Sequence, residues 1–307
     1  MKVREWLPVW LQNYVKPTAK EKTYVRYCEV VTHHLIPHIG ELEMSEVTPL
    51  TLQQMVTELS AHGNLRTGEG LSANTVNAIV TVIQAALQVA YRLGYLPEYT
   101  ADKVKRPKAA EKQIECFKVE EQKKIEAAAL ADRRPKMFGI VLCLYTGLRI
   151  GELLALEWSD VDFSKGELTI IKSCHDSKKD GRYCRLIEAP KTPTSRRIVP
   201  IPKQLLPLLR EQKKKTSSAF VVGEDKVQTV RSYQYSFSLL LRRIGVPHRG
   251  FHSLRHTFAT RALECGMDVK TLSEILGHKN PTVTLNRYVH SLMPHKHEMM
   301  NRLGKLL

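Results

Sequence analysis

The sequence predicts a mainly α-helical protein of two domains, with a small antiparallel β-sheet in the second domain. Apolar residues recur at helical spacing along most of the 307 residues, and the spacing changes to that of strands only between 167 and 201. A polar segment at 98–113 separates the two helical regions. With 43% hydrophobic residues, the chain is long enough to bury a core in each domain.

The first domain, residues 1–97, is expected to be a small bundle of four helices. Pro49 stands at the first position of the third helix, directly behind Thr48. Ser72 caps the fourth helix, which stops at Gly94. Apolar residues of the fourth helix follow the i, i+3, i+4, i+7 spacing of a buried helical face. The four helices cover 3–14, 18–36, a stretch that starts at 49, and 73–93.

A linker is expected at 98–113, because this segment has almost no large apolar residue and contains Pro107. The second domain, residues 114–307, is expected to combine helices with one sheet of three strands. Its tail at 292–307 carries an apolar stripe that fits a further helix. The strands are expected at 167–172, 182–189 and 196–201, and the other helices at 118–130, 135–145, 149–158, 203–214, 230–244, 254–264, 269–276 and 281–289.

The charge of the chain indicates a polyanionic partner. It holds 47 Lys and Arg against 31 Asp and Glu, a formal charge of +16, which favours nucleic acid and, in second place, an anionic membrane surface. Residues 111–307 hold 35 of these bases and 21 of the acids, so the second domain is the strongly positive one. No membrane-spanning or signal segment is expected.

The cysteines indicate a reducing cytosol. All six are scattered and none forms a Cys-x-x-Cys pair, so neither a disulfide framework nor a zinc ribbon is expected. Cys174, His175 and Cys184 are the one conceivable metal cluster, but they offer one ligand too few for a zinc site. We therefore expect no metal.

Four short segments of the second domain hold its most unusual residues. Taken singly, each has an ordinary explanation: an arginine behind a helix stop, a lysine in a basic hairpin, a hydrogen-bonded His and Arg pair, and a half-buried tyrosine. Taken together, they fit attack on a phosphodiester, whose transition state spreads negative charge over the non-bridging oxygens. The segments are TGLRIGEL (146–153), KTPTSRRIVP (191–200), HSLRHTFAT (252–260) and LGHKNPTVTLNRYVH (276–290).

Each step of such a reaction has a candidate residue. Arg149 and Arg255 can grip the phosphate oxygens through two-pronged contacts that stay charged at any relevant pH. Tyr288 is the candidate nucleophile, helped by a base or by nearby cations to become a phenolate. Lys191, on a basic hairpin, is the candidate acid that protonates the leaving 5′ oxygen.

Three further residues are candidates for supporting roles. His252 and His278 titrate near neutrality and can either donate to phosphate oxygens or move the proton of the phenol. Glu152 lies one helical turn beyond Arg149 and could orient one of these rings. Lys191 is preferred as the acid over three lysines of the same region, Lys172, Lys178 and Lys179.

The order of these residues resembles that of the tyrosine recombinase (phage integrase) family. The matching features are the arginine of TGLRIGEL, the His-x-x-Arg of HSLRHTFAT, the Gly-His of LGHKNP and a tyrosine ten residues beyond that histidine. The resemblance covers nearly the whole chain and is strongest to integrases of conjugative transposons and temperate phages. It implies a C-shaped two-domain DNA clamp, in which a helical core-binding domain precedes the catalytic domain. It also implies a 3′-phosphotyrosyl link at Tyr288, no cofactor and no external energy source, with the phosphate activated by Arg149, Lys191, His252, Arg255 and His278.

The resemblance further implies partners and a location. The expected substrates are duplex attachment or transposon-end sites, which the enzyme would cut and rejoin to integrate and excise a mobile element. A homotetramer that exchanges its 292–307 tails is implied, with accessory proteins, in the bacterial cytoplasm near the nucleoid and away from membranes. Many members carry an additional N-terminal arm-binding domain, whereas this chain begins in the core-binding region. Either this member lacks that domain or the sequence is truncated, and both alternatives stay open, as does a second class of DNA site.

Contacts with DNA are expected beside the proposed site, because residues 165–215 hold 14 Lys and Arg against five acids. The helices at 75–92 and 230–243 are candidates for reading bases in the major groove. Two other functions stay open: a DNA-binding regulator that keeps the fold without the chemistry, and a type IB topoisomerase that relaxes supercoils as a monomer. The candidate DNA contacts are Lys172, Lys178, Lys179, Arg182, Arg196, Arg197, Arg242 and Arg243.

Overall fold

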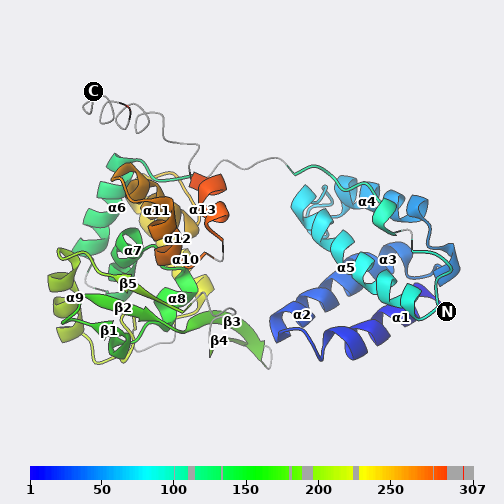
Figure 1. The fold of residues 1–307 in the computed structure, drawn as a ribbon, viewed down its shortest axis with the longest axis horizontal. Coiled ribbons are helices and arrows are strands. Elements are labelled where there is room, and N and C mark those ends of the chain that lie inside the picture. The colour runs from blue at the N-terminus through cyan, green and yellow to red at the C-terminus, as the bar shows by residue number, and fades with distance from the viewer. Residues whose placement is uncertain are drawn as a thin grey trace. The chain divides into compact units, whose positions relative to one another are not determined.

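The chain forms two compact units, Met1–Lys112 and Gln113–Leu307, each with its own hydrophobic core (Figure 1). The structure is a computed structural model, and residues 178, 179, 182–184, 283 and 286–288 are described by their backbone alone. In all, it describes residues 1–99, 101–109, 115–132, 134–179, 182–188, 196–223, 228–278, 280–288 and 300.

The N-terminal unit is a bundle of four helical rods, and all four helices expected from the sequence are confirmed. Two of the rods contain a π-helical turn, which ends the first rod and lies between two regular helical segments in the second. In chain order the elements are α1 (Val3–Trp10) with the π-helical turn Leu11–Val15, α2 (Glu21–Val30) with the π-helical turn Val31–Leu35 and α3 (Ile36–Ile39), the 3₁₀ turn Met44–Glu46, α4 (Pro49–His62), α5 (Ala73–Arg92) and the 3₁₀ turn Ala101–Lys103.

The predicted starts of α4 and α5 are confirmed by their capping contacts. The Thr48 hydroxyl accepts a hydrogen bond from the Thr51 amide (3.2 Å), and Pro49 opens the helix. The Ser72 hydroxyl accepts one from the Thr75 amide (3.3 Å). Both caps satisfy amides that have no partner within the helix.

Helix α5 is the central element of the N-terminal core. Eight of its side chains are buried, and the indole of Trp6 on α1 donates to the carbonyl of Ala86 (3.1 Å). By length and composition alone α5 could cross a membrane. Its apolar side chains are instead packed against the other helices of the unit, as in the core helix of a globular domain.

The first part of the predicted linker packs on the N-terminal unit and is not exposed as expected. Ala101 and Val104 are buried in the core, with 2% and 7% of their surface exposed. Gln84 on α5 donates to the carbonyl of Ala101 (2.7 Å), and Arg106 donates to the carbonyl of Asn77 on the same helix (3.2 Å). Two small apolar side chains and a few polar contacts are enough to hold this segment, although its composition is that of a linker.

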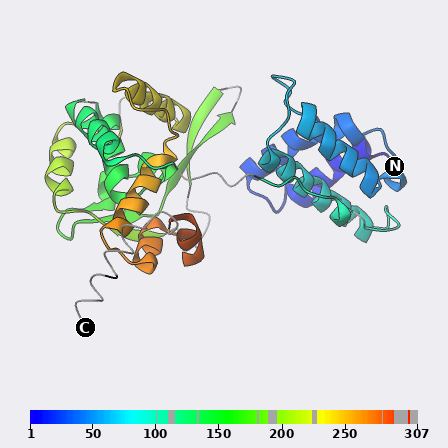
Figure 2. The same cartoon turned by 90° about the horizontal axis from the view of Figure 1, so that it is seen from above.

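The C-terminal unit is built around α7 (Pro135–Thr146), whose side chains are nearly all buried. Helix α11 packs along it, and both views show the two helices side by side (Figures 1 and 2). The predicted helices are present, although the one expected at 149–158 ends early and is followed by the 3₁₀ turn Trp158–Asp160. The other helices are α6 (Val119–Ala131), α8 (Ile150–Ala155), α9 (Leu205–Lys214), α10 (Val230–Arg243), α11 (His252–Glu264), α12 (Val269–Leu276) and α13 (Pro281–Tyr288).

The β-structure differs from the single three-stranded sheet that was expected. Strands β1 (Val161–Asp162), β2 (Glu167–Ile170) and β5 (Arg197–Pro200) form an antiparallel sheet in the order β1-β2-β5. Strands β3 (Ser173–Lys179) and β4 (Arg182–Glu188) pair as a separate hairpin, which extends from the body of the unit (Figure 2). The prediction that placed 182–189 in the three-stranded sheet was wrong, because an Asp-Gly pair between β3 and β4 favours local pairing into a hairpin.

The predicted tail helix at 292–307 lies outside the described residues, apart from Met300. The last complete element is therefore α13, which ends at Tyr288.

Candidate active site

Two helices that end in a left-handed glycine position the candidate residues. Gly147 (φ +64°) ends α7, and Arg149 follows it in the turn into α8. Gly277 (φ +63°) ends α12, and His278 follows directly. Other residues adopt this backbone conformation only with strain, and a Cβ on Gly147 would come within 2.4 Å of the Phe258 ring. Gly147 and Gly277 are therefore required by the two turns, and these turns place Arg149 and His278 in the site.

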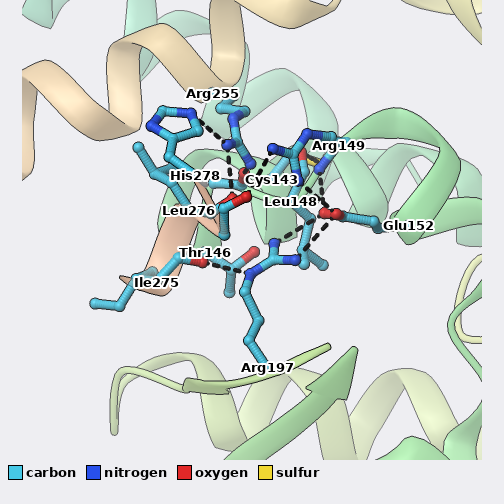
Figure 3. A network of polar contacts seen from close by, with 12 residues as sticks. Cys143, Thr146, Leu148, Arg149, Glu152, Arg197, Arg255, Ile275, Leu276 and His278 are labelled. Atoms are coloured by element: carbon cyan, nitrogen blue, oxygen red, sulfur yellow. Dashed lines mark hydrogen bonds and ion pairs between the residues drawn. The ribbon is translucent and has the colours of Figure 1, made fainter. Parts of the chain in front are cut away.

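Arg255 on α11 joins these two turns (Figure 3). Its Nη1 donates to the carbonyl of Gly147 (2.9 Å), and its Nη2 donates to the carbonyl of Leu276 (2.7 Å). The side chain is almost fully buried, with 2% of the residue exposed. A buried charge needs such hydrogen bonds, and these ones bring the segments of Arg149 and His278 together.

His278 is held between Arg255 and α13. Its Nε2 lies 2.9 Å from Nη2 of Arg255, and its Nδ1 lies 2.7 Å from the hydroxyl of Thr284. A guanidinium group has only donors, so Nε2 is the acceptor in the first contact. A neutral imidazole in this arrangement would carry its proton on Nδ1 and donate it to Thr284.

Arg149 is the more exposed of the two candidate arginines, at 35% of its side chain. Its Nη1 donates to Oε1 of Glu152 (2.8 Å), and its Nη2 donates to the carbonyl of Gly277 (3.2 Å). Its backbone amide donates to Oε2 of the same carboxylate (2.9 Å). These contacts hold the guanidinium beside the turn of His278 while part of it stays open to solvent.

Glu152 orients arginines, whereas the sequence indicated that it could orient a histidine. Arg197 on β5 forms a bidentate ion pair with its carboxylate: Nη1 donates to Oε1 (3.0 Å) and Nη2 donates to Oε2 (2.9 Å). The Nε of Arg197 donates to the carbonyl of Ile275 (2.6 Å). Both side chains of this pair are nearly buried, at 6% and 5% exposure.

Arg197 was expected to contact DNA, and the structure instead places its guanidinium inside the protein (Figure 3). The alternation of side chains along β5 already indicated that Arg197 is buried. Side chains alternate between the two faces of a strand, so Arg197 shares a face with Val199, which is buried, while Ile198 between them is exposed. Arg197 therefore links β5 to Glu152 and to the turn that carries His278.

The charge of Glu152 depends on its two arginines. Burial alone would raise the pKa of its carboxyl group, but the hydrogen bonds and charge of Arg197, helped by the charge of Arg149, outweigh burial and lower the pKa to about 2. Because the folded pKa lies below the ordinary value of 4.5, the pair stabilises the fold fully above that value. The contribution is lost as the pH falls from there towards 2.

We expect Glu152→Gln to destabilise the C-terminal unit at neutral pH by about 3 to 5 kcal/mol, because Arg197 then stays buried beside a neutral partner. Between pH 5 and pH 2 the wild-type chain should also lose about 3 kcal/mol more stability than the variant. Urea unfolding at a series of pH values measures both effects. If the free energy of unfolding changed with pH in the same way in the wild type and the variant, the role given to the ion pair would be contradicted.

The other three predicted catalytic residues are described to different extents. Tyr288 is the last residue of α13, and its side chain lies outside the described part of the chain. Lys191 lies outside the described residues, between β4 and β5. His252 begins α11 with an exposed side chain, and its ring packs edge-on against that of His256, with the centroids 4.5 Å apart.

The predicted DNA contacts are spread over several elements. Lys172, next to the start of β3, forms an ion pair with Glu157, with Nζ 3.0 Å from Oε2. Helix α10 carries two exposed arginines at its end, whereas α5 is the central core helix of its unit, so base reading by these two helices stays a prediction. Arg196, Arg242 and Arg243 are exposed, and Lys178, Lys179 and Arg182 lie at the end of the hairpin, where only the backbone is described.

The arrangement is suited to binding a phosphate group. Arg149, Arg255 and His278 meet around the turn at Gly277, and the exposed part of the Arg149 guanidinium can grip a phosphate through a two-pronged contact. Within the described ranges, no three His, Cys, Asp or Glu side chains gather as metal ligands would.

Two regions of the sequence match described protein families. Residues 115–295 match the phage integrase family, and residues 2–60 match the N-terminal SAM-like domain of phage integrases. Together the two matches cover most of both structural units.

Individual proteins resemble the chain over nearly its whole length. It is 32% identical over 325 residues to a XerC-like tyrosine recombinase of Caldanaerobacter subterraneus subsp. tengcongensis, across 97% of this chain and 81% of that protein. It is 28% identical over 304 residues to the ICEBs1 integrase of Bacillus subtilis, across 94% and 79% of the two chains. The fold matches that of the Tn1549 transposon integrase in complex with transposon right end DNA, with a TM-score of 0.82, 21% identity and coverage of 99% and 100%.

Proposed function

Because this chain belongs to the phage integrase family, the tyrosine recombinases, we propose that it is a site-specific DNA recombinase that cleaves and rejoins duplex DNA through Tyr288. The observation that carries the proposal is the meeting of Arg149, Arg255 and His278 around one glycine turn. A scissile phosphate bound there would have its developing negative charge neutralised by two guanidinium groups. Such electrostatic stabilisation of the transition state generally contributes more to the rate than any other single effect.

In cleavage, the phenol oxygen of Tyr288 attacks the phosphorus while the bond from phosphorus to the 5′ oxygen breaks. The phenol gives its proton to a base, for which His252 and His278 are the candidates. The 5′ oxygen takes a proton from Lys191 and leaves as a hydroxyl group. The product is a 3′-phosphotyrosyl link between DNA and protein.

Rejoining needs no external energy, because the phosphotyrosyl link keeps the energy of the broken phosphodiester. A 5′ hydroxyl group of another strand attacks the link, and the phenol leaves. Exchange between two duplexes requires four cleavages, so we propose a homotetramer in which each subunit cuts one strand. The apolar stripe of the 292–307 tail supports an exchange of tails between neighbouring subunits.

We propose that the substrates are attachment or transposon-end sites of a mobile element, which the enzyme integrates and excises with accessory proteins. The names of the ICEBs1 and Tn1549 relatives support a mobile element. In this scheme residues 1–97 bind the core site, residues 98–113 connect, and residues 114–307 carry out the chemistry. The expected DNA partner supports action in the bacterial cytoplasm, at the nucleoid.

A nicked duplex tests the proposal. Its site is first selected from a pool of random duplexes by binding to the full chain, and a nick is placed next to each candidate scissile position in turn. Cleavage then releases a short fragment and leaves the DNA strand on the protein, which is read as a slower band on a denaturing SDS gel. Strand exchange is scored between two such sites on plasmids.

The outcomes separate the three functions. An adduct together with exchange between two selected sites is the expected result. Relaxation of any supercoiled plasmid without preference for the site would favour a type IB topoisomerase. Tight binding with no adduct at any nick position would favour a DNA-binding regulator, and either of these results would overturn the proposal.

A further inference from the structure

We propose that Thr284 is a positioning residue that, together with Arg255, sets which nitrogen of His278 carries the proton, and that its hydroxyl allows this proton to change place when DNA binds. The inference rests on the proposed recombinase function, because it concerns the state in which His278 meets the scissile phosphate. Thr284 itself touches neither DNA nor the reacting atoms in this scheme.

The position of Thr284 supports the proposal. It lies on α13, and its side chain is fully buried, with 0% of the residue exposed. Its hydroxyl is 2.7 Å from Nδ1 of His278. Tyr288 follows four residues later on the same helix, so Thr284 and Tyr288 share a helical face. A single hydroxyl group thus connects the helix of the nucleophile to the histidine of the site.

Without DNA, the neighbours of His278 fix one tautomer. Arg255 donates from Nη2 to Nε2 of the ring (2.9 Å), and a guanidinium group cannot accept a hydrogen bond. Nδ1 therefore carries the proton and donates it to the oxygen of Thr284. In this state His278 presents a lone pair, and not a proton, on the side of Arg255.

A bound phosphate requires the opposite tautomer, with a proton on Nε2 of His278. Phosphate oxygens only accept hydrogen bonds, so an imidazole that stabilises the phosphate must present a proton on Nε2. In the neutral ring Nε2 then gains a proton from solvent while Nδ1 releases one, and Nδ1 becomes an acceptor that needs a donor. The Thr284 hydroxyl can turn and donate, whereas a backbone carbonyl or a carboxylate in its place could only accept. This dual capacity is the physical reason for a hydroxyl at this position.

The test compares two substitutions of one side chain. Thr284→Val keeps the shape of the buried side chain and removes the hydroxyl, whereas Thr284→Ser keeps the hydroxyl. With a nicked duplex under single-turnover conditions, we expect the valine variant to cleave about 10- to 100-fold more slowly and the serine variant to stay within about 3-fold of wild type. The affinity for DNA should not change in either variant. Equal cleavage rates for the valine and serine variants would overturn the proposal.

Thr282→Val is the matched control on the same helix. Thr282 is exposed, and its hydroxyl donates to the side chain of Asn280 (2.8 Å). The control should cleave like the wild type, because among the described residues the hydrogen bonds of this threonine's amide and hydroxyl go to Asn280 at the start of its own helix. If Thr282→Val also cleaved slowly, the loss of a threonine hydroxyl anywhere on α13 would slow cleavage. The slow cleavage of Thr284→Val would then not be specific to the contact with His278, and the proposal would be wrong.

A double-mutant cycle separates positioning from simple packing. In a chain with His278→Ala, the further change Thr284→Val should slow cleavage by less than about 2-fold, because Thr284 would act only through the histidine. If the valine substitution slows the His278→Ala chain as strongly as it slows the wild type, Thr284 acts by packing α13 and the proposal is wrong.

Nitrogen NMR of the free protein tests the tautomer without any reaction. In a chain labelled with ¹⁵N-histidine, whose His278 signal is assigned by its loss in His278→Ala, Nδ1 should be protonated and Nε2 should not. In the Thr284→Val variant Nδ1–H has lost its acceptor, so this preference should weaken although Arg255 still donates to Nε2. A proton on Nε2 of the wild type would overturn the proposal. Because this measurement needs no DNA, it distinguishes a failure of the Thr284 inference from a failure of the recombinase function.

Discussion

Tyr288→Phe is expected to abolish the covalent adduct with DNA, lowering the rate of cleavage by at least about 10⁴-fold. The substitution removes the oxygen that would form the phosphotyrosyl bond and keeps the aromatic ring at the end of α13. DNA affinity should stay within about 2-fold of the wild type, since the two arginines and the basic surface are unchanged. A denaturing gel measures the adduct, and a gel-shift titration measures the affinity.

Tyr235→Phe is the matched control, because Tyr235 lies on α10 of the same unit and is 62% exposed. With DNA at saturating concentration it should form the adduct at the wild-type rate, because a contact of α10 with DNA would change the affinity and not the chemistry. An adduct in the Tyr288→Phe chain at that same rate would show that another residue is the nucleophile, and the proposed chemistry would fail.

Arg149→Lys is expected to slow single-turnover cleavage by about 10²- to 10³-fold with little change in DNA affinity. In the free protein Arg149 already donates to Glu152 and to the carbonyl of Gly277, and part of its guanidinium faces solvent. A lysine carries the same charge on a single nitrogen, so it cannot keep both contacts and grip a phosphate with two prongs. Quenched-flow or manual time courses on the nicked duplex measure the rate.

Arg210→Lys is the control for this change. Arg210 is exposed on α9, where its guanidinium lies over the ring of Phe163 and contacts no candidate residue of the site in the described contacts. Its substitution should leave cleavage unchanged. If Arg149→Lys cleaved as fast as Arg210→Lys, the two-pronged phosphate contact would not be part of the mechanism.

The helices could be predicted from the sequence because their signals are local. A buried helical face repeats every three to four residues, and caps such as Thr48 and Ser72 lie directly at the ends that they stabilise. The pairing of strands was harder, because alternation identifies a strand without identifying its partner. The hairpin of β3 and β4 could have been found from the Asp-Gly pair between them, which is again a local signal.

The packing of 101–104 and the place of Arg197 could not be read from composition. Both segments are polar on average, yet Ala101 and Val104 fill a place beside α5, and the guanidinium of Arg197 is buried on Glu152. Whether a polar segment is exposed depends on what lies opposite it, and the partner of Arg197 lies 45 residues away in the chain. A count of charges therefore assigned Arg197 to the DNA surface together with its truly exposed neighbour Arg196.

By itself the sequence determined the helices, the charge of the second unit, and the identity and order of the arginine, histidine and tyrosine side chains of the proposed reaction. Only the tertiary structure decided that Arg255 is buried against two glycine turns, that Arg149 keeps an exposed edge, and that His278 lies between Arg255 and Thr284. The reason is physical: side-chain chemistry belongs to each residue, whereas burial and hydrogen-bond partners are set by segments that are distant in the chain. Arg149 and the carbonyl of Gly277, for example, are separated by 128 residues.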